Sequence, residues 1–263
     1  MIIQKISAAY FSPTGTTKKV AKSMLTEFII PQKEIDLTPY ENRNNSYSFR
    51  ENELVLIGIP VYGGQVPSIA EERITQLKGE NTPAILFVTY GNVHFFDALF
   101  DLQKIVVANG FIPVAAAAIV SEHNVVKGFA TGRPNSKDLA DISTFIRQAK
   151  EKISRANHLD AITVKGATHS DMKSKIRSRL KNRLPIKPHA TNNCTNCGVC
   201  VKLCPIHAIS NPRKTAGASC ICCMRCIRYC PQKARTYGKA KEIVAKGFLK
   251  LVSRGEKQLE FFL

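Results

Sequence analysis

Nine cysteines occur in the sequence, and eight of them fall into two runs with the same spacing. The runs read CTNCGVCVKLCP and CICCMRCIRYCP, and each contains the pattern C-x2-C-x2-C-x3-C-P. Three thiolates in one tight loop can bind three iron corners of a cubic iron–sulfur cluster. The fourth cysteine lies farther along the chain and binds the other cluster of a two-cluster module. The spacing therefore predicts two [4Fe–4S] clusters.

Each predicted cluster takes three cysteines from one run and the last cysteine of the other run. The first ligand set is Cys194, Cys197, Cys200 and Cys230, and the second set is Cys220, Cys223, Cys226 and Cys204. The second run repeats the first at a constant offset, which indicates duplication of a small unit. Cys222 is the ninth cysteine and has no counterpart in the first run, so we expect a packed spectator and not a ligand.

Zinc and disulfide bonds are the alternative explanations of these cysteines. Zinc sites use two separated C-x2-C pairs, which would leave the third cysteine of each run without a role. Disulfides are rare in a reducing cytoplasm, where we expect this chain to reside. The runs also resemble those of the bacterial two-cluster ferredoxins over about residues 190–236. This resemblance implies a small ferredoxin-type α+β domain.

A second stretch that could bind a ligand lies near the N-terminus and reads YFSPTGTT. It follows an apolar run of strand length and opens a segment with helical periodicity. Hydroxyls, free N–H groups and the positive end of the helix dipole converge there and favour an anion. The residues expected to bind it are Ser12, Thr14, Gly15, Thr16 and Thr17. The loop matches neither a Walker loop nor G-x-G-x-x-G, and an ordinary helix cap is the alternative.

Two more loops follow apolar runs and carry a tyrosine beside glycine, namely IPVYGGQVPS and VTYGNVHFFD. In an open α/β sheet, ligands bind at the carboxyl edge of the strands, beside the point where the strand order reverses. Tyr62 and Tyr90 could flank a planar ring, while the glycines let backbone N–H groups approach its polar edge. An ordinary loop aromatic is the alternative for each tyrosine. The expected contacts are Pro60, Val61, Tyr62, Gly63, Gly64, Thr89, Tyr90, Gly91 and Asn92.

The N-terminal loop resembles the S/T-x-T-G-x-T loop of flavodoxins, whose hydroxyls bind the phosphate of FMN. Flavodoxins often cover the flavin ring with tryptophan, and this chain has none. The chain as a whole resembles flavodoxin-like proteins fused at their C-terminus to a two-cluster ferredoxin, which occur in anaerobic bacteria and archaea. The resemblance implies FMN, two [4Fe–4S] clusters and a role as an electron carrier or reductase.

We therefore interpret the chain as an electron-transfer flavoprotein that couples one-electron and two-electron chemistry. The main alternative is a reductase in which FMN, fed by the ferredoxin domain, reduces a small molecule such as a quinone, a nitro compound or an activated alkene. A redox sensor that uses its clusters only as structure is a third class. Candidate proton donors near the ring are Tyr62, Tyr90, His94 and His123, and none of them is assigned a catalytic role.

Strand-length apolar runs alternate with helical segments through the first part of the chain. The runs are IIQKISAAY, EIDL, LVLIGI, AILFVTY and FIPVAAAAIV. Continuous apolar strands separated by amphipathic helices predict an α/β domain with a flavodoxin-like doubly wound, five-stranded parallel sheet. The expected units are residues 1–160 for this domain, 161–189 for a basic linker, 190–238 for the ferredoxin-type domain and 239–263 for a helical tail.

The net charge of +18 lies almost entirely in the C-terminal part. Residues 1–160 contain 17 Lys or Arg and 16 Asp or Glu, whereas residues 161–263 contain 21 and 4. This basic part predicts a redox partner, an electron-transfer protein or enzyme, with an acidic docking face. We do not expect nucleic acid as the partner, because no aromatic stacking platform accompanies the charge.

The linker stretch DMKSKIRSRLKNRLPIKP spaces its apolar residues four apart, as in one stripe of a basic amphipathic helix. We expect a solvated connector, with a docking surface for an acidic partner or anionic lipid as the alternative. Its length allows a cluster to face the FMN of the same chain or that of a second copy in a homodimer. No apolar run reaches the ~18 residues of a membrane span and no signal-peptide pattern occurs, so a cytoplasmic location is expected.

Overall fold

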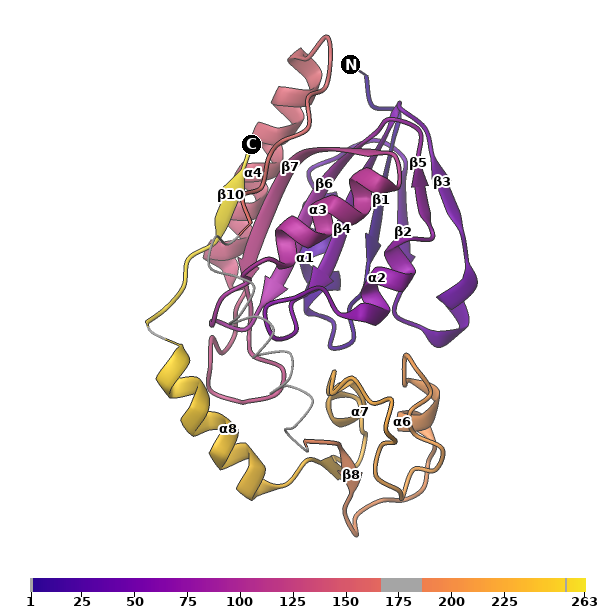
Figure 1. Ribbon diagram of the computed structural model, residues 1–263, viewed down its shortest axis with the longest axis vertical. Coiled ribbons are helices and arrows are strands. Elements are labelled where there is room, and N and C mark those ends of the chain that lie inside the picture. The colour runs from indigo at the N-terminus through magenta and orange to yellow at the C-terminus, as the bar shows by residue number, and fades with distance from the viewer. Residues whose placement is uncertain (1, 167–185, 254) are drawn as a thin grey trace.

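The computed structural model describes residues 2–166, 186–253 and 255–263, and a six-stranded sheet forms the centre of its first domain (Figure 1). The strands lie in the order β10-β7-β6-β4-β1-β2. All neighbours are parallel except β10, which runs antiparallel to β7. The strands are β1 (Lys5–Tyr10), β2 (Gln32–Asp36), β4 (Glu53–Pro60), β6 (Thr82–Tyr90), β7 (Phe111–Val120) and β10 (Glu260–Phe262).

Helices cover both faces of this sheet. Helices α1 (Thr16–Leu25) and α4 (Ser136–Arg155) pack on one face, and α2 (Ser68–Ile74) and α3 (Ala98–Ala108) pack on the other. Successive residues of a strand point to opposite faces, so the central strands bury apolar side chains in both layers. This two-sided burial is the reason that β4 and β6 read as continuous apolar runs.

The five parallel strands follow the order 2-1-3-4-5 when they are numbered along the chain. This is the flavodoxin-like order of doubly wound sheets, with a switch point between the first and third parallel strands, here β1 and β4. The predicted fold class is thus confirmed. A short parallel pair, β3 (Tyr47–Phe49) with β5 (Leu77–Gly79), and a 3₁₀ turn, η1 (Tyr40–Asn44), extend the domain beside α2.

The second domain is small and repeats its own backbone. It contains β8 (His189–Ala190), α6 (Val199–Lys202), α7 (Arg225–Arg228) and β9 (Arg235–Thr236), and β8 pairs antiparallel with β9. Positive φ angles recur at equivalent positions of the two runs, at Asn196 and Cys222 (59° and 54°), Gly198 and Met224 (78° and 61°), and His207 and Lys233 (51° and 48°). The duplication in the cysteine spacing is therefore also a duplication of conformation.

The C-terminal segment returns to the first domain. Helix α8 (Lys239–Val252) leads away from the second domain, and the chain then ends as β10 on the edge of the large sheet (Figure 1). The ring of Phe261 stacks on that of Phe145 in α4 at 4.8 Å. The C-terminal segment, for which we expect a helix, is therefore a helix followed by a strand. The predicted amphipathic linker helix falls mainly in residues 167–185, which lie outside the described residues.

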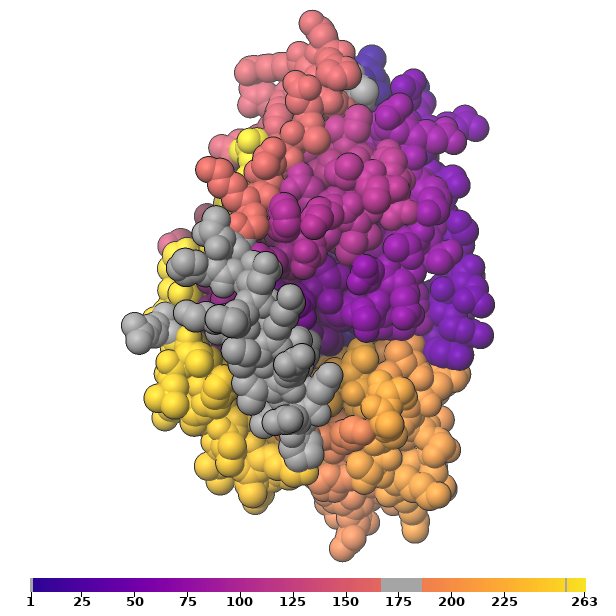
Figure 2. Space-filling model, viewed as in Figure 1, coloured from indigo at the N-terminus to yellow at the C-terminus, as the bar shows by residue number. Residues whose placement is uncertain are grey.

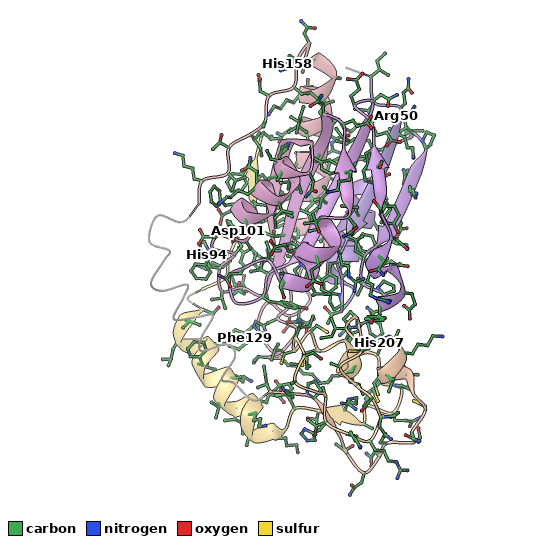
Figure 3. All side chains as sticks on the ribbon, turned by 45° about the vertical axis from the view of Figure 1, so that its right-hand side comes forward. Arg50, His94, Asp101, Phe129, His158 and His207 are labelled. Carbon is green, nitrogen blue, oxygen red and sulfur yellow. The ribbon has the colours of Figure 1, made fainter. Side chains whose placement is uncertain are left out.

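The second domain packs against the carboxyl edge of the parallel strands, and its atoms meet those of the first domain to the right of the grey residues in Figure 2. Ile206 and Ile221 of the second domain join the apolar core beneath α2 and α3. His207, labelled at the domain boundary in Figure 3, stacks on Tyr40 of η1 with ring centroids 3.5 Å apart. The edge of the sheet where a ligand is expected is thus also the docking face of the second domain.

Candidate cofactor sites at the domain boundary

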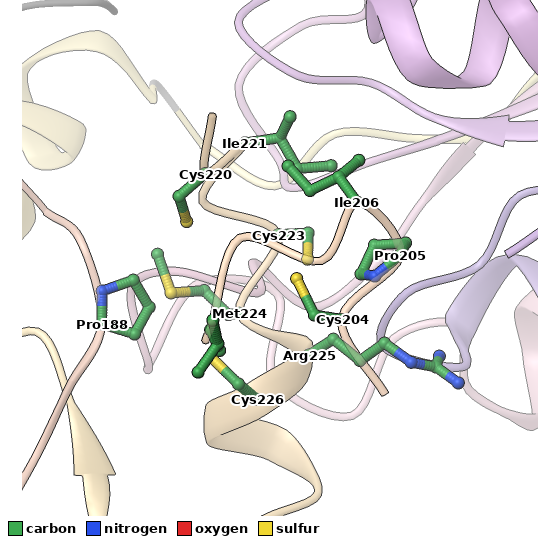
Figure 4. A pocket seen from close by; sticks show the side chains of 11 residues that line it. Pro188, Cys204, Pro205, Ile206, Cys220, Ile221, Cys223, Met224, Arg225 and Cys226 are labelled. Carbon is green, nitrogen blue, oxygen red and sulfur yellow. The ribbon is translucent and has the colours of Figure 1, made fainter. Parts of the chain in front are cut away.

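The second predicted ligand set converges in one pocket of the small domain (Figure 4). The pocket is lined by Cys204, Cys220, Cys223 and Cys226, with apolar neighbours that include Pro188, Ile206, Ile209, Ile221 and Met224. Cys204 comes from the first run and the other three thiols from the second, as the predicted exchange of ligands requires. Within the described ranges, no three Cys, His, Asp or Glu side chains are placed to hold a single metal ion. Four thiols around an apolar pocket suit a larger inorganic group.

Burial raises the pKa of two of the thiols in this pocket. It raises the pKa of Cys223 to about 12 and that of Cys226 to about 11. These thiols therefore carry their protons at neutral pH until a metal displaces them. Ala208 N donates a hydrogen bond to Cys204 Sγ at 3.2 Å. Such N–H···S hydrogen bonds raise the reduction potential of a bound cluster.

Cys222 occupies the position that Asn196 has in the first run, with the same left-handed backbone conformation. Its backbone N donates to Cys220 Sγ at 3.4 Å, and its own Sγ lies 3.9 Å from Cys220 O. The hydrogen bond between the two side chains raises the pKa of Cys222 and lowers that of Cys220. Cys222 does not line the thiol pocket, which agrees with the expected spectator role.

The four thiols of the first predicted ligand set differ in exposure. Cys200 is buried, Cys194 and Cys230 are half-buried, and Cys197 is exposed. Cys230 Sγ accepts a hydrogen bond from Ala234 N at 3.2 Å, which repeats the Ala208 contact of the first run. Assignment of these four thiols to one cluster stays a prediction.

Arg235 is a buried cation between the two thiol sets, and the sequence pattern did not single it out. Its Nη1 lies 3.8 Å from Cys200 Sγ, and its charge also opposes the burial that raises the pKa of Cys226. Nη1 donates to Pro212 O and Nη2 to Pro188 O, both at 2.8 Å. Carbonyl oxygens thus stabilise this buried guanidinium, and thiolates add to the stabilisation when they form.

The predicted phosphate loop divides into residues that build it and residues that face a ligand. Gly15 caps α1 with φ of 91°, and Ser12 Oγ accepts a hydrogen bond from Lys18 N at 2.9 Å. Ser12 thus accepts a hydrogen bond from one of the N–H groups that have no partner within the first turn of α1. Thr17 Oγ1 lies 2.9 Å from Thr89 Oγ1 and joins the loop to the end of β6.

Thr14 and Thr16 instead line a cavity of about 450 Å³ between the two domains. The other lining residues are Glu122, His123, Asn124, Val125, Lys127, Met224, Ile227, Arg228, Lys233, Arg235, Thr236, Tyr237 and Glu242. The volume falls within the roughly 300–1,000 Å³ of small-molecule pockets. Basic side chains outnumber acidic ones along its wall. Thr14 lies just before α1 and Thr16 begins it, where the N–H groups of the first turn have no partner within the helix. This donor set fits the phosphate of a flavin mononucleotide.

The loop after β4 forms a tight turn beside the thiol pocket. Tyr62 and Gln65 exchange backbone hydrogen bonds at 3.1 and 3.3 Å, and Gly63 and Gly64 between them have φ of 61° and 85°. A Cβ on Gly64 would lie 2.6 Å from the ring of Phe96, so only glycine fits there. Burial raises the pKa of Tyr62 well above its ordinary value, and the charge of Cys223 adds to the effect. Tyr62 is therefore near the thiol pocket, whereas Pro60 ends β4 and Val61 follows it.

Two residues at the end of β6 and in the loop after it, Tyr90 and Asn92, were predicted to contact the ring and contact the C-terminal segment instead. The ring of Tyr90 is buried in the core, and its hydroxyl donates to Gln258 O at 3.3 Å. Asn92 Nδ2 donates to Ser253 Oγ and Gly255 O, and Asn92 Oδ1 accepts from Lys257 N, each at 3.0 Å. In this structure both side chains hold the C-terminal segment and neither lines the cavity. The loop prediction could not anticipate this, because the partner lies at the far end of the chain.

The loop after β7 supplies the cavity wall that sequence reasoning mostly missed. His123 lines the cavity, and its Nδ1 accepts hydrogen bonds from Val125 N at 3.2 Å and Val126 N at 3.0 Å. Nδ1 is thus an acceptor, which leaves the proton on Nε2. Burial lowers the pKa of His123 to about 4. Gly91 is required beside it, because a Cβ there would lie 2.6 Å from the His123 ring.

Hydrogen bonds fasten the small domain over these loops. Tyr237 Oη donates to Val125 O at 2.5 Å, and Asn124 Nδ2 donates to Cys223 O at 3.4 Å. The buried Arg73 of α2 donates from Nη2 to Pro205 O at 3.2 Å. Its Nη1 also donates to Pro39 O, so the cation bridges both domains. None of these contacts has a sequence motif of its own.

Comparison with known proteins gives one family model and a set of solved structures. The family model, described as a 4Fe-4S dicluster domain, matches residues 151–246, and no curated protein matches the chain. Among solved structures, an archaeal flavodoxin aligns at 14% identity, 57% of this chain, 99% of its own and TM-score 0.40. Oxidised flavodoxin 2 from Bacillus cereus aligns at 16% identity over 56% of this chain and 99% of its own, with a TM-score of 0.41. Rubredoxin oxygen:oxidoreductase from Desulfovibrio gigas aligns at 14% identity over 58% of this chain and 38% of its own, with a TM-score of 0.41.

The chain thus joins a flavodoxin-like α/β domain to a small ferredoxin-type iron–sulfur domain. The first part of this statement follows from the strand order, and the second from the cysteine repeat and the matching family model. Among the helices that the structure describes, none is long and apolar enough to cross a membrane.

Proposed function

We propose that the protein is an electron-transfer flavoprotein that binds FMN and two [4Fe–4S] clusters and passes electrons between them within one chain. When bound, clusters exchange single electrons and a flavin exchanges one or two, so the pair links one-electron carriers to two-electron chemistry. The observation that carries the proposal is the position of Met224. Its buried side chain lines both the thiol pocket and the 450 Å³ cavity, so the two sites share a wall.

The residues of the chain have separate tasks in this proposal. The thiols of Cys204, Cys220, Cys223 and Cys226 would hold the cluster next to the cavity, and Cys194, Cys197, Cys200 and Cys230 the more distant one. Thr14 and Thr16, with the first turn of α1, would hold the flavin phosphate. His123 presents Nε2–H and stays neutral, so it can donate a hydrogen bond without adding charge. The docked ferredoxin domain would limit the access of water to the space between the sites.

The contacts between the domains support an intrachain path. They run from the phosphate loop, η1, α2 and the loop after β7 to the same small domain, and all lie within one chain. A homodimer is therefore not needed to bring a cluster to the cavity. This supports a carrier that works as a single copy.

The composition test is an anaerobic absorbance spectrum with iron, sulfide and flavin counted on one sample. About eight irons and one FMN per chain are expected for two [4Fe–4S] clusters and one flavin site. Zinc in place of iron, or about four irons, would contradict the assignment of both ligand sets. Riboflavin phosphate that fails to bind the purified, cluster-loaded chain would contradict the flavin site.

The kinetic test follows flavin bleaching after the clusters of the loaded protein are reduced. An intrachain path predicts a rate that does not change with protein concentration, whereas transfer between molecules predicts a proportional increase. The small-molecule reductase remains the second candidate, because the cavity wall includes two side chains that could donate a proton, His123 and Tyr237. Saturable oxidation of the reduced protein by a quinone or nitro compound would favour that candidate over a protein acceptor.

The basic ferredoxin domain supports an acidic protein partner. Residues 190–240 contain eight Lys or Arg and no Asp or Glu. Opposite charge on a partner would accelerate encounter, and salt would screen it with a Debye length of about 8 Å at physiological ionic strength. We expect the electron-transfer rate to an acidic ferredoxin to fall with added salt and the rate to a basic cytochrome to rise. The cytoplasmic location stays an expectation that cell fractionation can test.

A further inference from the structure

Helix α7 lies between the two sites that the proposed function gives to different cofactors. Cys223, just before the helix, and Cys226, within it, line the thiol pocket. Ile227 and Arg228 of the same helix line the 450 Å³ cavity, and Met224 lines both. A displacement of this segment would therefore change both sites together.

Arg225 connects the two sites directly. It precedes the predicted ligand Cys226 in the chain and lines the thiol pocket. Its side chain leaves the thiol pocket toward the flavodoxin-like domain, as Figure 4 shows, and Nη1 donates to Pro13 O at 2.8 Å and lies 3.4 Å from Ser12 O. One residue thus lines the thiol pocket and bonds the backbone of the phosphate loop. Its Nε is buried and has no hydrogen-bond partner within the described residues.

A second contact from the same segment closes over the phosphate loop. The hydroxyl of Tyr229 lies 3.0 Å from the position that a Cβ on Gly15 would take. The guanidinium of Arg225 lies over the ring of Tyr229, 5.2 Å from its centroid. Tyr229 and Arg225 therefore approach the loop side by side. The absence of a side chain at Gly15 allows this approach, and φ of 91° there favours glycine for a second reason.

The backbone of residues 220–229 includes two strained conformations that other interactions must stabilise. Cys222 and Met224 both have positive φ, 54° and 61°, which costs free energy for residues other than glycine. Conformations of this kind persist when surrounding interactions determine them. Bonds from a cluster to Cys220, Cys223 and Cys226 would fix the segment at three points around these two residues. Without a cluster, fewer interactions hold α7 against the phosphate loop.

We infer that the cluster-ligating segment 220–229 is the closing wall of the flavin site, so that an assembled cluster strengthens FMN binding through Arg225 and its loss releases the flavin. This inference rests on the proposed function. Thermodynamic linkage makes the coupling reciprocal: bound FMN stabilises the cluster to the same extent that the cluster stabilises FMN. The chain would then lose its flavin when oxidation destroys the cluster beside it, instead of retaining a flavin that can no longer receive electrons.

The test is a cycle of four FMN dissociation constants, measured anaerobically by quenching of flavin fluorescence in the full chain. The four samples are wild type and Arg225→Ala, each with assembled clusters and after iron chelation. Loss of a charge-assisted hydrogen bond weakens binding by roughly tenfold or more, so clusters should tighten FMN binding at least tenfold in the wild type. In Arg225→Ala, clusters should change it less than about threefold. Unchanged cluster absorbance in the loaded variant shows that its ferredoxin domain is folded.

Arg213→Ala is the matched control, since Arg213 is an exposed arginine of the same domain. It should show the wild-type coupling. Equal FMN affinity with and without clusters in the wild type would overturn the inference, as would full coupling in Arg225→Ala. A cluster-loaded wild type that binds no FMN at all would instead contradict the proposed function. The two failures are therefore distinguishable on the same samples.

Discussion

The guanidinium Nη1 of Arg235 lies 3.8 Å from the sulfur of Cys200, and both Nη1 and Nη2 donate to backbone carbonyls. Its charge also acts on Cys220 and Cys226, so one buried cation serves both predicted ligand sets. A positive charge at this place favours the reduced, more negative state of a bound cluster. It therefore helps to set the cluster potential as well as the fold.

We predict that Arg235→Gln lowers the reduction potential of the clusters. A unit charge about 6 Å away contributes on the order of 3 kcal/mol at an effective dielectric constant near 20, which corresponds to roughly 100 mV for one electron. Redox titration followed by electron paramagnetic resonance measures the shift. Lys202→Gln, at an exposed position of α6, is the control and should move the potential by much less. Unchanged potentials in Arg235→Gln would limit this residue to a structural role.

The two neighbouring cysteines of the second run should differ in their effect on iron content. Cys222→Asn should keep the full iron and sulfide content, because the equivalent Asn196 adopts the same left-handed conformation and Asn tolerates it. Cys223→Ser should lose the cluster beside the cavity and about half of the iron. Iron and sulfide analysis of anaerobically reconstituted protein decides the matter. Retention of all iron by Cys223→Ser together with loss in Cys222→Asn would reverse the ligand assignment.

Acid should destabilise the fold through His123. Its pKa is about 4 in the folded chain, below the ordinary 6.5, so the unfolded state binds a proton that the folded state does not between these values. The contribution of neutral His123 to the free energy of unfolding is fully present above pH 6.5 and is lost as the pH falls toward 4. The free energy of unfolding therefore decreases by about 2 kcal/mol between pH 7.5 and pH 5. Urea unfolding of the wild type and His123→Gln at both pH values measures this loss, which the variant should lack. The exposed His158→Gln is the control, and its pH dependence should match the wild type.

Removal of the Asn92 side chain should free the C-terminal segment. Its three hydrogen bonds hold Ser253, Gly255 and Lys257, which lie between α8 and β10. Asn92→Ala leaves buried partners unpaired and should cost about 2–3 kcal/mol. Hydrogen exchange should show loss of protection in β10 and adjoining β7, with the rest of the sheet unchanged. Asn44→Ala, at an exposed position of η1, should leave protection of β10 as in the wild type, and equal protection in Asn92→Ala would refute the assigned role.

The sequence by itself determined the chemistry and the sheet. Spacing within each cysteine run specifies which thiols can share a cluster, because ligands a few residues apart are brought together by local backbone conformation. The same spacing predicts that Cys222 is not a ligand. Continuous apolar runs between helical segments specified a parallel sheet, because only two-sided burial tolerates them. The position of the loop before α1 could also be predicted locally, because it lies between an apolar run of strand length and a helical segment.

Tertiary structure decided how these parts face one another. Arg225 meets Pro13 from the opposite end of the chain, Asn92 binds the C-terminal segment, and the tail adds β10 to the sheet. Tyr90 was expected at the flavin ring, yet its side chain is buried by that returning segment. Contacts of this kind depend on how two folded surfaces match, and no local spacing or periodicity encodes them. The wall between the thiol pocket and the cavity is formed by such contacts, so the sequence pattern alone does not reveal it.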